Sequence, residues 1–113
     1  MEKTTVTAGE KKFTAEVADS ILRKAWGLSM RTEGKMLFKF RRSSRPRIDM
    51  MLVQKPLNLY FLSEEKEVID VQKADPWTPN PRTWKTYRPS KPAKYLIESF
   101  QEIGLKEGEK VSF

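Results

Sequence analysis

The side chains best suited to binding chemistry are cations and aromatic rings gathered in two segments. The first segment, residues 41–47, reads RRSSRPR and holds Arg41, Arg42, Arg45 and Arg47. Guanidinium groups at this density can bind phosphates or carboxylates through paired hydrogen bonds. The simpler interpretation is a solvated loop between two strands, because runs of charge usually face water. The sequence favours that simpler interpretation.

The second segment, residues 75–95, interleaves aromatic rings with cations and prolines. It reads DPWTPNPRTWKTYRPSKPAKY, and five of the seven prolines of the chain lie within it. Such rings can stack on bases while the cations pair with phosphates, and they could equally bind an acidic or proline-rich protein. The alternative, slightly favoured, is a long ordered loop that Trp77 and Trp84 pin to the sheet. The candidate ligand-binding residues of both segments are Arg45, Arg47, Trp77, Arg82, Trp84, Lys85, Tyr87 and Arg88.

The composition narrows the chemistry further. The chain has neither cysteine nor histidine, so the usual zinc, copper and haem ligands, the thiol nucleophile and the commonest general base are absent. We therefore expect no cofactor and no metal site. The acidic residues Asp49, Asp70, Asp75 and Glu98 show no spacing that would pair two carboxylates for acid–base work. The methionines Met30, Met36, Met50 and Met51 could form a soft metal site, but core filling is favoured.

The positive charge is concentrated in the same two segments. The 113-residue chain carries a net charge of +7, which favours acidic partners without specifying one. Residues 41–47 contribute +4 and residues 72–95 contribute +5, so the remainder is slightly acidic. An acidic protein, a small anion and nucleic acid all remain open as partners.

The elements that must position these segments begin with a predicted hairpin over residues 56–72. Leu57, Leu59 and Phe61 alternate with residues that are themselves largely apolar, which indicates a central strand covered on both faces. A charged loop of about four residues follows. The β-branched run around residues 68–71 then suits a second strand.

Flanking segments predict several short strands and little helix. Alternating or apolar patterns indicate strands near residues 13–17, 36–40, 48–53, 95–98 and 109–113. A short helix is expected near residues 20–26, after an N-cap at residues 18–20, and one helical turn over residues 100–103. Residues 1–12 are expected to be a flexible terminus and residues 13–113 a single domain. The predicted fold is a compact, mainly-β sandwich or barrel.

No stretch of the sequence predicts a membrane segment. No apolar run approaches the ~20 residues of a membrane span, and the first thirteen residues lack the apolar core of a signal peptide. We therefore expect a cytoplasmic protein with no membrane partner.

Five segments, in this order and spacing, resemble the domain-of-unknown-function 192 family of small β-rich proteins. They are FTAEVADSILRKAWGLSMR, GKMLFKF, MMLVQKPLNLYFL, PAKYLIESF and GLKEGEKVSF, and together they span residues 13–113. The resemblance implies a mainly-β, sandwich-like fold with a short helix, and it implies no reaction.

Departures from the family pattern occur in its turn and at the polar positions of its central motif. The family turn Gly-Leu-Met-x-Arg is matched by Gly27, Leu28 and Arg31, with Ser29 in place of Met. In the central motif, which resembles Met-Lys-Asn-Thr-x-x-Pro-Leu-Asp, the matching residues are Met50, Pro56 and Leu57. The polar positions of that motif are occupied here by Met51, Leu52, Val53 and Asn58.

The sequence favours a non-enzymatic binding or accessory module that uses the proline-rich segment, with the arginine segment, for an anionic or protein ligand. The alternative is an enzyme of unknown class with a polar pocket near Asn58. The first interpretation predicts that the cations of the two segments meet on one surface. The second predicts a concave pocket with convergent polar groups.

Overall fold

Six strands form one mixed sheet in this computed structural model, which describes residues 2–18 and 33–113. The strands are β1 (Lys3–Ala8), β2 (Lys11–Ala18), β3 (Lys35–Ser44), β4 (Leu57–Leu62), β5 (Val68–Ala74) and β6 (Ala93–Ser99), and one 3₁₀ helix, η1, spans Pro81–Thr83. Their order in the sheet is β1-β2-β3-β6-β4-β5. Only β2 and β3 run parallel, and the other neighbours are antiparallel. The mainly-β prediction is confirmed.

The predicted hairpin lies at the centre of the packing. All six residues of β4 are buried, and β4 pairs with β5 on one side and β6 on the other. Leu57, Leu59 and Phe61 contribute to one core cluster, while Tyr60 and Leu62 contribute to a second. A strand that feeds two cores explains why its sequence is apolar at both phases of the alternation.

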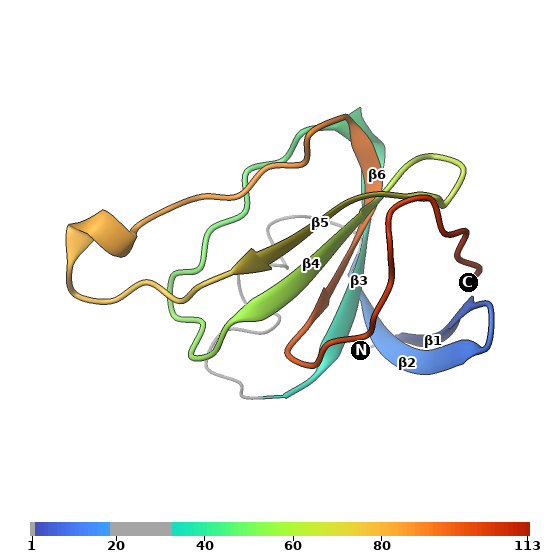
Figure 1. The fold of residues 1–113 in the computed structure, drawn as a ribbon, viewed down its shortest axis with the longest axis horizontal. Coiled ribbons are helices and arrows are strands. Elements are labelled where there is room, and N and C mark those ends of the chain that lie inside the picture. Colours follow the sequence, from blue (N-terminus) through green and yellow to red (C-terminus); the bar gives the residue numbers. More distant parts are fainter. Residues whose placement is uncertain (1, 19–32) are drawn as a thin grey trace.

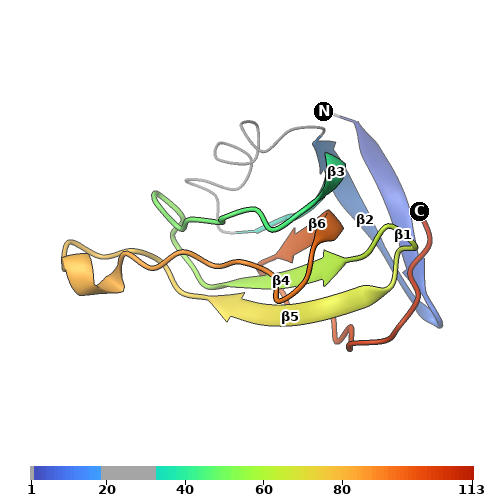
Figure 2. The same ribbon diagram turned by 90° about the horizontal axis from the view of Figure 1, so that it is seen from above.

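The C-terminal segment joins the two ends of the sheet. Thr7 of β1 exchanges backbone hydrogen bonds of 2.9 and 2.8 Å with Ser112, and the amide of Val68 donates to Glu109 O at 2.9 Å. Figures 1 and 2 show β1 and β2 turned across the end of the other strands, with the C-terminal segment running beside them. Edge strands with free backbone groups invite pairing with other chains. The segment bonds to both edge strands, at Thr7 of β1 and at Val68 of β5, and the sheet is therefore barrel-like.

A tyrosine inside the second core ties β4 to the turn after β6. The Tyr60 hydroxyl donates to Glu102 Oε1 at 2.9 Å and accepts from the Ile103 amide at 3.0 Å. The Gly104 amide also donates to Glu102 Oε1 at 3.0 Å. Burial of the ring and the nearby Glu102 carboxylate together raise the pKa of Tyr60 above its usual 10.0. Both causes act against the tyrosinate, so the folded state holds the proton more tightly than the unfolded chain.

We expect this tyrosine to make the fold sensitive to alkali. Because the folded pKa is raised, the stabilisation is complete below about pH 10 and is lost as the pH rises further. Tyr60→Phe should cost about 1–2 kcal/mol at neutral pH, since the Ile103 amide loses its acceptor. Urea unfolding from pH 8 to 11 should show the gap between the two proteins narrowing above pH 10. A difference in unfolding free energy that stays constant over this pH range would contradict the raised pKa of Tyr60.

Residues 3–8, which lie in the segment 1–12 expected to be a flexible terminus, form strand β1. Lys3–Ala8 pairs along its whole length with β2, in register from Lys3↔Glu16 to Ala8↔Lys11. The polar side chains that suggested a tail belong to an edge strand, whose exposed side reaches water. Only Val6 and Ala8 of β1 are buried, which is too sparse a pattern for a sequence-based strand prediction.

Three further expectations of regular structure are wrong. Of residues 48–53, only Ile48 makes a β-bridge, and Leu52 adopts a left-handed φ of 63°. A turn replaces the expected strand there, because Val53 N donates to Met50 O and Met51 N to Asp49 Oδ1. Residues 100–103 form bends without a helical turn, and residues 109–113 make isolated bridges without a continuous strand.

The predicted helix near residues 20–26 lies outside the described residues. Within the described ranges, no helix has the length and apolar character required to cross a bilayer.

Candidate functional site

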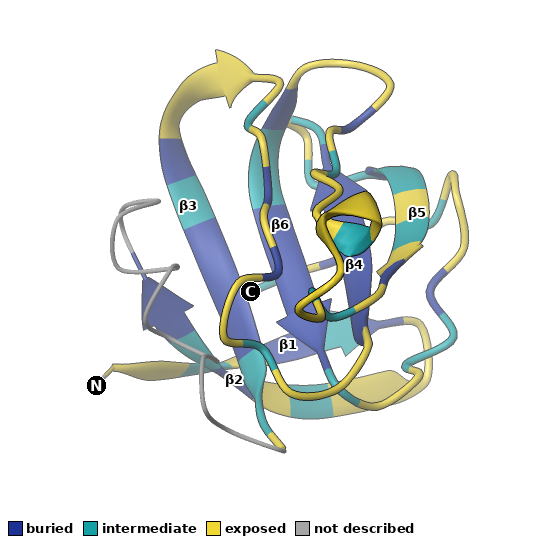
Figure 3. Ribbon diagram, turned by 90° about the vertical axis from the view of Figure 1, so that its left-hand side faces the viewer, coloured by how far each residue is buried: buried dark blue, intermediate teal, exposed yellow. Residues whose placement is uncertain are grey.

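Residues 75–92, here called the projecting loop, leave the end of β5 and extend away from the sheet before returning as β6 (Figures 1 and 2). The only regular structure in the loop is η1, as its prolines predict. Asn80 caps η1 by accepting from the Arg82 amide at 3.0 Å, and the Trp84 amide donates to Pro81 O at 3.0 Å. Figure 3 views the molecule along this projection, with η1 foremost.

The two tryptophans of the loop stack on each other with different exposure. Their ring centroids are 5.9 Å apart and their planes differ by 24°. Trp77 packs against the first core cluster and donates Nε1–H to Lys85 O at 2.7 Å. Trp84 donates Nε1–H to Thr78 O at 2.8 Å, yet the residue remains 52% exposed. Trp77 therefore pins the loop, and Trp84 rests on it as an exposed ring.

The arginine segment, residues 41–47, meets the base of the projecting loop. Ile48 and Tyr87 exchange backbone hydrogen bonds of 2.8 Å, which places Arg47 opposite Arg88. Arg45 Nε donates to Pro89 O at 2.8 Å, and Arg88 Nε donates to Arg45 O at 3.0 Å. Three arginines from segments about forty residues apart are thus neighbours, and all three are exposed.

Arg82 and Lys85 lie farther out, around a cavity of about 290 Å³ in the loop itself. The cavity is lined by Asp75, Pro76, Thr78, Arg82, Thr83, Lys85 and Tyr87. Of the candidate residues, the structure thus groups Arg45, Arg47 and Arg88 at the base and Arg82, Lys85 and Tyr87 around the cavity. Tyr87 links the two groups through its backbone pairing with Ile48.

The Asp70 carboxylate anchors the end of the projecting loop that leads into β6. The sequence indicates this residue only as a candidate for acid–base chemistry. Asp70 Oδ2 accepts from the Ser90 amide at 2.8 Å and from Gln72 Nε2 at 2.9 Å. Gln72 Nε2 also donates to Arg88 O at 2.6 Å. The only sequence signal was a pair of polar residues at alternating positions of β5, which is common in any half-exposed strand.

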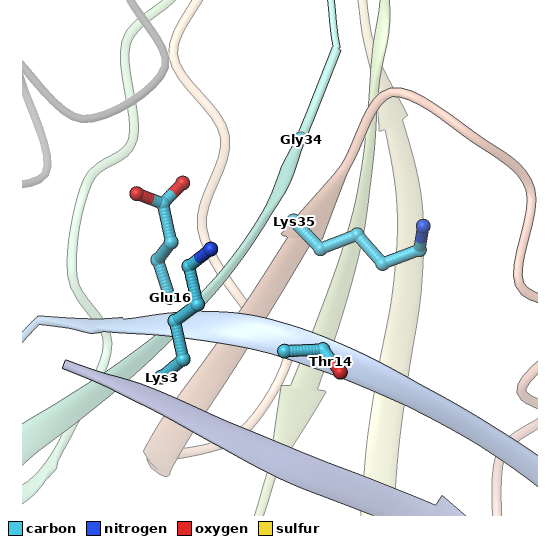
Figure 4. Close-up of a pocket in the computed structure, with 5 residues that line it drawn as sticks. All are labelled: Lys3, Thr14, Glu16, Gly34 and Lys35. Carbon is cyan, nitrogen blue, oxygen red and sulfur yellow. The ribbon is translucent and has the colours of Figure 1, made fainter. Parts of the chain in front are cut away.

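Another cavity, of about 260 Å³, lies among β1, β2 and the start of β3 and is lined by Lys3, Thr14, Glu16, Gly34 and Lys35. Figure 4 shows Lys3 and Glu16 extending to the same side while Lys35 points away from them. Lys35 Nζ donates to Gln101 Oε1 at 2.8 Å. The cavity mixes charges of both signs and includes none of the predicted site residues. No group of three potential metal ligands occurs in the described part of the chain.

The remaining candidates lie in the sheet or its turns. Asn58 is only 8% exposed and donates Nδ2–H to Ser99 O at 3.2 Å. Glu98 is buried on β6 beside Met36 and Leu59. Met50 is a core residue like Met36, whereas Met51 is exposed; Met30 lies outside the described residues.

Comparisons with known proteins agree with the fold. The DUF192 family model, described as "Uncharacterized ACR", matches residues 3–113. A UPF0127 protein of Pyrococcus abyssi is 32% identical over 99 residues, which cover 85% of this chain and 77% of that protein. A crystal structure of a protein of unknown function from Novosphingobium aromaticivorans superposes with a TM-score of 0.76 at 22% identity, covering 96% of this chain and 82% of the other.

A second crystal structure, from Sinorhizobium meliloti, superposes with a TM-score of 0.78 at 17% identity over 97% of this chain and 91% of the other. The name of that protein proposes a role in transcription regulation. At such identities the two structures support the fold alone.

Proposed function

This chain belongs to the DUF192 family of uncharacterised proteins, and we propose that it is a binding module whose projecting loop holds single-stranded nucleic acid. The proposal rests on one observation above all. Trp84 presents a half-exposed ring that is held in place from behind by a second tryptophan. A fixed aromatic face accepts any base by stacking, and the unpaired bases of a single strand are free to stack on it.

The cations around this ring support the same ligand. Arg82, Lys85 and Arg88 are exposed, and none of them forms an ion pair with another described residue. Arg45 and Arg47 add two more exposed cations at the base of the loop. Such a group can follow a sugar–phosphate backbone while the ring takes a base. An acidic protein would also bind these cations, but it has no nucleobases to stack on the Trp84 ring.

The alternative function, an enzyme with a polar pocket at Asn58, has less support. The Asn58 side chain is almost fully covered and its amide group bonds to backbone. It lines neither of the two cavities described above. A catalytic pocket needs room for a substrate beside its polar groups.

We expect Trp84→Ala to weaken binding of a fluorescein-labelled twelve-nucleotide oligothymidylate by about tenfold, as loss of one base stack predicts. Fluorescence anisotropy at low and moderate salt measures the effect. Trp84→Phe is the matched control, because it keeps a ring but loses the Nε1–H bond to Thr78. If Phe weakens binding as much as Ala, the ring is not a stacking platform. If the unaltered protein fails to bind any oligonucleotide even at low salt, the proposed function is wrong.

A further inference from the structure

The cavity in the projecting loop carries charges of opposite sign that do not touch. Arg82, Lys85 and Asp75 all line it. The Asp75 carboxylate forms no ion pair with either cation. The same cavity therefore presents a ligand with two cations and one carboxylate that do not neutralise each other in an ion pair.

The walls of the cavity are fixed by hydrogen bonds within the loop. The Asp75 amide donates to the Tyr87 hydroxyl at 3.1 Å, which holds one wall against the other. The Thr78 amide donates to Thr83 Oγ1 at 2.8 Å, and Lys85 O accepts from Trp77. A cavity built in advance loses less entropy when a ligand binds than a loop that must first close.

The size and position of the cavity suit one sugar–phosphate unit of a strand. The volume of about 290 Å³ is just below that of typical small-molecule pockets, roughly 300–1,000 Å³. Thr83 and Lys85 line the cavity, whereas Trp84 between them does not and is exposed instead. A base on Trp84 and the adjoining sugar in the cavity would then belong to one short stretch of strand.

Building on the proposed function, we infer that the loop cavity selects RNA. A phosphate binds Arg82 and Lys85, and the ribose 2′-hydroxyl donates a hydrogen bond to the Asp75 carboxylate. Cations match phosphate oxygens, and carboxylates are natural acceptors for a ribose hydroxyl. The 2′-hydroxyl is the group by which a protein distinguishes RNA from DNA.

The test compares three twelve-nucleotide oligonucleotides of one sequence, which contain ribose, deoxyribose or 2′-fluoro-ribose sugars. The 2′-fluoro strand keeps the sugar shape of RNA but has no hydroxyl to donate. We expect RNA to bind about tenfold more tightly than either of the others, as one charge-assisted hydrogen bond predicts. Asp75→Ala should bring all three to similar affinity, without weakening the binding of DNA. Arg82→Gln should weaken all three alike.

The outcomes separate this inference from the proposed function. If RNA and DNA bind equally to the unaltered protein, or if the preference survives in Asp75→Ala, the inference is overturned while nucleic-acid binding stands. If 2′-fluoro RNA binds as well as RNA, the sugar shape is recognised and the Asp75 contact is wrong. If none of the strands binds, the proposed function itself fails.

Discussion

Phe61→Ala should lower the free energy of unfolding by about 3–5 kcal/mol, the usual cost of removing a buried phenylalanine ring. Phe61 is fully buried in the first core cluster, on the strand that carries both cores. A domain is typically stable by roughly 5–15 kcal/mol, so this single change should bring the protein close to unfolding at room temperature. Urea denaturation followed by circular dichroism measures the loss directly.

The neighbouring strand offers a matched control for this experiment. Val71 lies on β5, is 39% exposed, and pairs with Tyr60 across the ladder. Val71→Ala removes apolar atoms from the same hairpin at a position that water already reaches, so we expect a loss below about 1 kcal/mol. Equal losses for the two variants would show that β4 is not the centre of the packing.

Replacing Arg45, Arg47 and Arg88 together by glutamine should abolish most of the salt dependence of nucleic-acid binding. Each phosphate neutralised on a single strand contributes about 0.7 to the slope of log K against log salt. Three lost contacts should make the slope shallower by about 2, which corresponds to an affinity loss of roughly 500-fold at 50 mM salt relative to 1 M salt. Oligothymidylate binding measured from 50 to 300 mM salt gives both quantities.

Two further triple variants test whether the loss of affinity depends on positive charge at these three positions. Substituting lysine for the same three arginines keeps the charge but not the bonds that Arg45 and Arg88 make to the backbone, and the salt slope should survive. Substituting glutamine for the exposed Lys12, Lys106 and Lys110 removes equal charge from β2 and the C-terminal segment, which lie opposite the projecting loop in Figure 1. A slope reduced equally by this control would mean that net charge alone drives binding.

The central hairpin could be predicted because its signal is local. Apolar residues at successive positions of β4 point to both faces of the sheet, so both faces must be packed against other residues. β-branched residues follow in β5. The strand expected at residues 48–53 was equally apolar, yet a turn formed there. Leu52 and Met51 are more than half exposed, so apolar character alone did not predict burial when the backbone turned away from the sheet.

The candidate site was predictable in its parts but not in its assembly. Composition identified Trp77, Trp84 and the surrounding cations, and the prolines identified an irregular loop. No sequence pattern indicated that Trp77 would be fixed and Trp84 exposed, since the difference depends on which ring contacts the core. The role inferred for Asp75 likewise depends on the residues across the cavity, which the chain brings together only on folding.

The sequence by itself determined the family, the mainly-β class, the buried hairpin and the concentration of positive charge in two segments, because each follows from residue type and short-range periodicity. Only the tertiary structure decided that those segments meet. The backbone pairing of Ile48 with Tyr87 and the closure of the sheet by residues 108–112 join positions far apart in the chain. Backbone hydrogen bonds of this kind are available to every residue except proline as donor, so they leave almost no mark on the sequence.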